Sequence, residues 1–153
     1  DVSLELPNAP QIFQETGQAD VKMSLAQRVD SLGDDLHEVV LTVTVTATVG
    51  EKTAYLVEVA QAGIFQVGGS NEQALHAVMN TMCPTALFPY SRQVISSLVA
   101  EAGFPPLVLQ PVNFDMLYAQ RMQQLAEEQK GDETGEAGDT NGAAAMPEFS
   151  TND

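Results

Sequence analysis

The stretch that most constrains the fold is a run of alternating residues at positions 37–49, HEVVLTVTVTATV. From Val39 onward the odd positions are apolar, whereas positions 42, 44, 46 and 48 are all threonine. Alternation with a period of two in β-branched residues is typical of a strand with one buried face and one wetter face. Residues 50–52 predict a turn, and Thr53–Ala62 predicts a strand that returns as the partner in a hairpin.

The predicted return strand carries a second pattern. Tyr55, Val57 and Val59 share one parity, and Leu56 and Glu58 share the other. If the odd set packs on the core, Leu56 and Glu58 lie together on the wetter face. An apolar side chain beside an acid on a threonine-rich face suggests a docking patch. The alternative is a single surface leucine, which is ordinary in soluble proteins.

Shorter elements are predicted on both sides of this hairpin. Residues 2–6 predict an edge strand, followed by a loop or one helical turn at Ile12–Phe13. Residues 21–25 predict another strand, residues 30–35 a turn, and residues 64–67 a further short strand. The flanking glycines are too irregularly spaced for a dinucleotide-binding fingerprint, and no phosphate-loop lysine follows them.

The second half of the sequence is helical in pattern. A first helix is predicted to begin at the N-cap Asn71 and to end at Pro84. A second is predicted from Pro89, which suits a first helical position, to Gly103. Prolines predict an extended crossing loop over residues 104–112, and Asn113 is predicted to cap a last helix. Residues 131–153 hold six acids and no base, which predicts a disordered acidic tail after a domain of residues 1–130.

Charge and cysteine content limit the classes of function. The 153 residues include 6 Lys and Arg against 21 Asp and Glu, which gives a formal charge of −15. This charge argues against nucleic-acid binding and against docking on an anionic membrane, and it suits a partner with a basic patch. Cys83 is the only cysteine, so a disulfide within the chain and a cysteine-based zinc site are both excluded. No apolar run approaches the length of a membrane-spanning helix, and we expect a soluble, cytoplasmic protein without a cofactor.

Residues that could carry catalysis are sparse. His37 and His76 lie in different predicted elements and form no metal-ligand spacing, and Cys83 has no base next to it in sequence. The carboxylate pairs Asp34–Asp35 and Asp1/Glu5 are typical of solvated surface. We therefore expect no enzyme. Methionines at helical spacing and the apolar, proline-stiffened loop suggest either core filling or grooves that adapt to many sequences.

Five stretches of the sequence resemble the SecB family of bacterial protein-export chaperones. They occur in the order and at the spacing of that family: PNAPQIFQ at 7–14, EVVLTVTV at 38–45, GIF at 63–65, CPTALFPYSR at 83–92 and PVNFDMLY at 111–118. The resemblance covers roughly residues 1–125, and the CPTALFPY stretch at 83–90 and the PVNFD stretch at 111–115 are together specific. It implies an α+β protomer, a four-stranded antiparallel sheet backed by C-terminal helices, assembled as a dimer of dimers.

The resemblance also implies a function. Such a protein holds newly made precursors unfolded without ATP and delivers them to the SecA motor ATPase for export. In the family the motor docks on the outer face of the sheet, and the matching positions here are Asp1, Glu5, Leu56 and Glu58. The parity of the return strand places Leu56 and Glu58 on that face independently. Candidates for the groove that binds unfolded clients are apolar and aromatic: Tyr55, Val57, Val78, Met82, Leu107, Tyr118 and Met122.

Three departures from the family pattern and three alternatives accompany this hypothesis. Family members usually carry a stretch before the position of Asp1, so we expect the natural chain to start earlier. Ala77 and Val78 stand where His and Cys are frequent, and Val57 stands where Cys is common. The alternatives are a SecB-like chaperone dedicated to an antitoxin, a small acid-dependent enzyme, and a purely structural oligomer.

Overall fold

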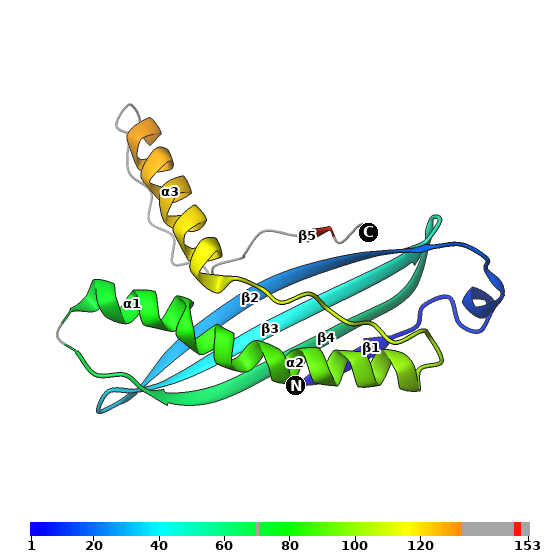
Figure 1. The fold of residues 1–153 in the computed structure, drawn as a ribbon, viewed down its shortest axis with the longest axis horizontal. Helices are drawn as coiled ribbons and strands as arrows, with labels where there is room; N and C mark the ends of the chain where they lie inside the picture. Colours follow the sequence, from blue (N-terminus) through cyan, green and yellow to red (C-terminus); the bar gives the residue numbers. More distant parts are fainter. Residues whose placement is uncertain (70, 133–148, 151–153) are drawn as a thin grey trace.

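Three long strands that follow one another along the chain form the centre of an antiparallel sheet. They are β2 (Ala19–Gly33), β3 (Leu36–Val49) and β4 (Lys52–Gln66). The computed structural model describes residues 1–69, 71–132 and 149–150, and among these the strand order is β1-β4-β3-β2-β5 (Figure 1). The short strands β1 (Val2–Glu5) and β5 (Phe149–Ser150) lie at the two edges.

Tight turns make these strands longer than the sequence predicts. Asp34 and Asp35 join β2 to β3, and both have positive φ angles, of 50° and 61°. Aspartate tolerates this left-handed conformation, and two such residues suffice to close a hairpin. The predicted turn at 30–35 is therefore too long, since β2 continues to Gly33. The predicted separate strand at 64–67 is also wrong, because β4 runs unbroken through Gly63 to Gln66.

The alternation along β3 separates the two faces of the sheet as predicted. Its odd-numbered side chains from Val39 to Ala47 are fully buried beneath the helices, together with Met23 and Leu25 of β2. The threonines of β3 lie on the opposite face, which we call the outer face. On β4, Tyr55, Val57 and Val59 are buried on the helical side, so the parity predicted for the return strand is confirmed.

In the part of the chain that the structure describes, three helices lie on the helical side. They are α1 (Glu72–Asn80), α2 (Met82–Glu101) and α3 (Phe114–Asp132). The predicted caps are confirmed: the Asn71 side chain accepts hydrogen bonds from the backbone of Gln73 and Ala74, and Asn113 accepts one from Met116 at 3.0 Å.

Both proline predictions for the helices are wrong. Pro84 lies in the first turn of α2, where its missing N–H has no helical partner to lose, and Pro89 lies inside the same helix. The first helix ends earlier, at Asn80. Burial of Leu87, Phe88 and Ile95 against the sheet outweighs the hydrogen bond that Pro89 removes. Gly103 follows α2 with a φ of 94°, as expected for a helix terminator.

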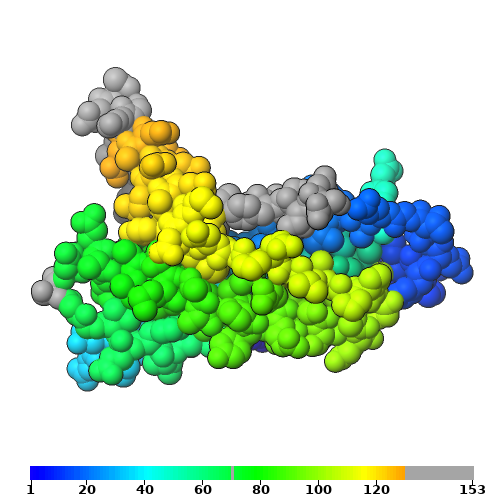
Figure 2. Space-filling view, viewed as in Figure 1, coloured from blue at the N-terminus to red at the C-terminus, as the bar shows by residue number. Residues whose placement is uncertain are grey.

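Helix α2 and the segment that follows it pack on the helical side of the sheet. In Figure 1, α2 lies along the sheet, and residues 104–113, the crossing segment, run in extended form from α2 to α3. Figure 2 shows the crossing segment filling the space between α2 and β2, and Leu109 within it is buried. The predicted crossing loop is thus confirmed. Helix α3 projects away from the sheet (Figure 1).

The N-terminal turn and the C-terminal segment complete the described chain. Gln11–Gln14 form one 3-10 turn, η1, as predicted at Ile12–Phe13. Most of the predicted tail, residues 131–153, lies outside the described residues. Within it, α3 continues to Asp132, and Phe149–Ser150 pair with β2 as β5, a strand that the sequence pattern does not predict.

Candidate functional site

An aromatic cavity opens where η1, β4 and the start of the crossing segment meet. The rings of Phe13 and Phe104 stack with centroids 4.9 Å apart, and the Tyr55 ring lies 5.0 Å from Phe104. The cavity has a volume of about 450 Å³. Besides these rings, it is lined mainly by apolar and small residues: Ile12, Gly17, Ala19, Val21, Val49, Ala54, Gly103, Pro105, Pro106 and Leu107.

Local sequence explains the shape of this aromatic cavity. Gly103 has a left-handed backbone with a φ of 94°, which glycine adopts without strain, and this turn places the start of the crossing segment beside the Phe13 ring. Pro105 and Pro106 keep the start of the crossing segment extended where it lines the cavity. Phe13 is 49 % exposed whereas Tyr55 is 5 % exposed, so the cavity has an open rim and a buried wall.

The lining of the aromatic cavity suits the binding of apolar side chains. Burial raises the pKa of the Tyr55 phenol above its ordinary value of 10.0, so the phenol stays neutral at physiological pH. Glu15 on the rim is ion-paired with Lys52. Stacked rings and aliphatic walls suit the aromatic and aliphatic side chains of an extended polypeptide.

The structure brings together only two of the seven predicted groove residues in this cavity, Tyr55 and Leu107. Val57 is fully buried in the core, and Val78 packs partly buried against the core. The other three lie on the helices: Met82 is exposed on α2, Tyr118 on α3 lies with its hydroxyl 3.1 Å from His76 Nδ1, and Met122 is partly exposed on α3.

Phe13 and Phe104 were not among the predicted groove residues. Each was visible in the sequence, Phe13 in the first helical turn and Phe104 on the crossing loop. Their stacking joins segments about 90 residues apart, which no local pattern reveals.

The four residues matched to motor docking lie together on the outer face. Glu5 of β1 pairs with Leu56 of β4, and Ser3 pairs with Glu58. The backbone amine of Asp1 bonds to the Ala60 carbonyl at 3.0 Å, so the chain end continues the same register. Side chains two residues apart share a face, which places Asp1, Glu5, Leu56 and Glu58 in one patch.

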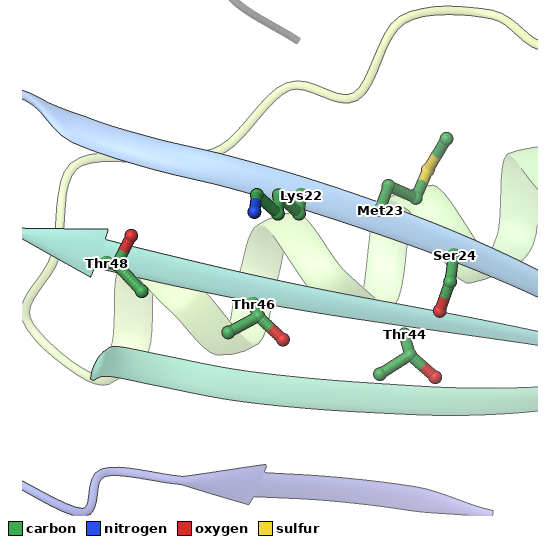
Figure 3. Close-up of a pocket in the computed structure, with 6 residues that line it drawn as sticks. All are labelled: Lys22, Met23, Ser24, Thr44, Thr46 and Thr48. Atoms are coloured by element: carbon green, nitrogen blue, oxygen red, sulfur yellow. The ribbon is translucent and has the colours of Figure 1, made fainter. Parts of the chain in front are cut away.

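Glu58 is held in this outer-face patch by a neighbouring strand. The Thr44 hydroxyl donates a hydrogen bond of 3.0 Å to its carboxylate. Farther along the outer face, a shallow hollow of about 290 Å³ is lined by Thr44, Thr46 and Thr48 of β3 and residues 22–24 of β2 (Figure 3). Among the described residues that line this hollow, Lys22 is the one titratable side chain.

A third hollow lies between the strands and α1. It has a volume of about 470 Å³ and brings together His37, His76 and Arg121 beside Glu72. The two histidines thus line the same hollow although they lie far apart in sequence. Among the residues that the structure describes, no group of three or more His, Cys, Asp or Glu side chains is placed to hold a metal.

Cys83 is buried at the start of α2. Its sulfur lies 3.8 Å from the sulfur of Met79, and burial raises the pKa of the thiol. A nucleophilic cysteine needs the opposite shift, because the thiolate is the reactive form. The environment of Cys83 is therefore that of a core residue.

Comparison with known proteins identifies the family. The family described as "Preprotein translocase subunit SecB" matches residues 1–125. A protein-export protein SecB of Alkalilimnicola ehrlichii is 50 % identical over 133 residues, which cover 87 % of this chain and 71 % of the relative. The chain belongs to the SecB family. SecB of Chromobacterium violaceum is 51 % identical over 127 residues, covering 83 % of this chain and 85 % of the relative.

A solved structure supports the same fold at low sequence identity. A SecB-like chaperone of Mycobacterium tuberculosis, solved with a peptide from an antitoxin, matches with a TM-score of 0.61 at 18 % identity. The match covers 74 % of this chain and 84 % of that one. It confirms an α+β fold with an antiparallel sheet and C-terminal helices. In the described part of the chain, no helix combines the length and apolarity needed to cross a membrane.

Proposed function

We propose that this SecB-family chain is an ATP-independent chaperone that holds precursor proteins unfolded and delivers them to the SecA motor ATPase for export. The observation that carries the proposal is the open aromatic cavity formed by Phe13, Tyr55 and Phe104. The relatives named as protein-export proteins supply the export context.

The cavity suits weak, sequence-tolerant binding. Each buried aromatic or aliphatic client side chain contributes about 1.5–3 kcal/mol. Ring stacking and dispersion do not depend on one particular client residue. A precursor held at several such points keeps most of its chain disorder, which lowers the entropic cost of binding and permits release.

Delivery to the motor would use the outer-face patch of Asp1, Glu5, Leu56 and Glu58. Its acids and leucine lie on the sheet face opposite the aromatic cavity, so motor and precursor could bind together. Three carboxylates in a chain of charge −15 would attract a basic segment of the motor and accelerate its encounter with the patch. Because this attraction is screened, motor binding should weaken as salt rises.

The chaperone would work in the cytoplasm as a dimer of dimers, as the family resemblance implies. Exposed apolar side chains on the helices and crossing segment support further burial in an assembly. Tyr90 is 64 % exposed, Val108 75 % and Met116 55 %. Such side chains are typical of surfaces that associate.

The alternative of a chaperone dedicated to one antitoxin has weaker support. It shares the fold, and the Mycobacterium tuberculosis protein binds an antitoxin peptide. That match is only 18 % identical, whereas relatives at 48–51 % identity are named as export proteins. The export function is therefore favoured.

The proposal is tested by the refolding of a chemically unfolded precursor, without nucleotide, in the presence of this protein. Wild type should stop refolding at stoichiometric amounts. Phe104→Ala should bind the precursor about tenfold more weakly or worse, because one aromatic contact is lost. Gln110→Ala, a truncation of an exposed polar residue on the same segment, should hold the unfolded precursor as wild type does.

Circular dichroism melts of both variants would show that the fold is intact. Refolding at an unchanged rate in excess wild-type protein would contradict the chaperone function. If Phe104→Ala held the unfolded precursor as tightly as wild type, the aromatic cavity would not be the site that binds the client.

A further inference from the structure

The strand β5 occupies an edge of the sheet to which an extended chain can add. Phe149 pairs with Met23 and Ser150 pairs with Lys22, both antiparallel. β2 (Ala19–Gly33) is the outermost of the three long strands in the sheet order. Without β5 it would therefore be the edge of the sheet in the described chain. Edge strands present backbone N–H and C=O groups to any extended segment, whatever its sequence.

The position of β5 connects this edge to the aromatic cavity. Ala19 and Val21, at the start of β2, line the cavity, and the next two residues of β2 pair with β5. A polypeptide whose side chain enters the cavity and whose backbone continues along β2 would reach Lys22 and Met23 within one or two residues. β5 therefore occupies backbone positions that such a polypeptide would use.

The chemistry of the C-terminal sequence agrees with a contact at this edge. Residues 131–153 contain six acids and no Lys or Arg, and Lys22 is one of only six Lys and Arg in the whole chain. A C-terminal sequence of this charge is attracted to the exposed Lys22 modestly and in a salt-screened way.

We propose that the edge of β2 at Lys22–Met23 is a docking site for extended polypeptide, occupied in cis by the chain's own Phe149–Ser150. An unfolded precursor bound in the aromatic cavity displaces β5 from this edge. The C-terminal segment is then a built-in competitor that lowers affinity for clients and favours their release. This competition rests on the proposed chaperone function, whereas the docking of β5 does not.

The test compares the full chain with a variant whose β5 cannot donate ladder hydrogen bonds. Phe149→Pro with Ser150→Pro removes both backbone N–H groups of β5. Thr140→Pro is the matched control, since it places a proline in the same C-terminal sequence outside β5. Amide hydrogen exchange of Lys22 and Met23 reports docking, and titration with a reduced, carboxymethylated and permanently unfolded polypeptide reports competition.

The double proline variant should lose exchange protection at Lys22–Met23 and bind the unfolded polypeptide about fivefold more tightly, the change expected when about one net hydrogen bond of competition is removed. Thr140→Pro should match wild type in both measurements. A synthetic peptide of residues 146–153, added to the double proline variant, should restore protection.

Unchanged protection in the double proline variant would overturn the docking of β5. Lost protection with unchanged polypeptide affinity would overturn the competition. If no form of the protein bound the polypeptide, the proposed chaperone function would fail and the competition with it, while the exchange measurement would still decide whether β5 docks.

Discussion

At the scale of single residues, the two faces of β4 carry different chemistry on adjacent positions. Val57 is fully buried against the helices, and its neighbours Leu56 and Glu58 lie on the outer face beside Glu5 and Ser3 of β1. A substitution at Leu56 or Glu58 therefore changes the outer face without entering the core. This separation makes the proposed docking patch testable by charge reversal.

We predict that Leu56→Arg or Glu58→Lys weakens binding of the SecA motor at least tenfold, because each places a positive charge where a basic segment is proposed to dock. Ile64→Arg is the matched control. Ile64 is exposed on the same face of β4, roughly 20 Å beyond Glu58 at about 3.3 Å per residue. Calorimetric titration at low and high salt measures the effect, and a loss as large for Ile64→Arg would show a general charge effect instead of a local site.

A second prediction at this scale concerns the pH dependence of stability through Cys83. Burial raises the pKa of its thiol in the folded protein, while the unfolded chain keeps a value near 9.0. The contribution of the neutral thiol to the free energy of unfolding is thus fully present below about pH 9. It is lost as the pH rises through the folded pKa, since the thiol of the unfolded state deprotonates first.

Urea unfolding of wild type and Cys83→Ala measures this contribution. As the pH rises from about 8 to about 10, the free energy of unfolding of wild type should fall relative to that of Cys83→Ala. Comparing two proteins that differ only at this residue cancels the contributions that both proteins share. A pH-independent difference would contradict the burial argument.

At the scale of secondary-structure elements, the sequence predicts what depends on near neighbours. The alternation of β3 and the caps at Asn71 and Asn113 follow from a few adjacent residues, and the structure confirms them. The extent of α2 does not follow locally. Pro89 suggests a helix start, yet the helix continues through it because its apolar side chains pack on the sheet.

The candidate sites also differ in how far the local sequence predicts them. The positions of Leu56 and Glu58 follow from the two-residue period of a strand, so the outer-face patch was predictable. The aromatic cavity depends on contact between η1, β4 and the crossing segment, and only Tyr55 and Leu107 of its lining were predicted. The motifs of the family supplied the function, which neither charge nor periodicity could specify.

The packing of α2 on β4 gives a prediction for this scale. A Cβ at Gly63 would lie 2.9 Å from Leu87 of α2 and 3.0 Å from the Phe65 ring. Gly63→Val should therefore destabilise the protein by about 1–3 kcal/mol through overpacking. Ala62→Val, which adds a side chain on the exposed outer face one residue away, should change stability by less than about 0.5 kcal/mol.

Urea denaturation with linear extrapolation measures both variants. If the two valine variants were equally stable, α2 would not pack on Gly63 as the structure has it.

At the scale of the whole molecule, the sheet has a polar outer face and a helical side with exposed apolar side chains. Such apolar side chains favour association of the chain with further copies of itself. Tyr90, Val108 and Met116 are exposed in the single chain. We predict a sedimentation mass of four times the 16.3 kDa chain, with a dimer as the intermediate on dilution. A mass of one chain at micromolar concentration would contradict the proposed dimer of dimers.

Holding and delivery of a precursor can be tested together in a transfer measurement with three components. An unfolded precursor is loaded on the protein without nucleotide, the SecA motor is added, and the composition of the complexes is followed by light scattering coupled to chromatography. We predict that wild type holds the precursor and binds the motor at the same time, because the aromatic cavity and the outer-face patch lie on opposite faces of the sheet. Leu56→Arg should hold the precursor but fail to recruit the motor. Release of the precursor with no motor bound, or recruitment of the motor by Leu56→Arg equal to wild type, would contradict the proposed delivery through the outer-face patch.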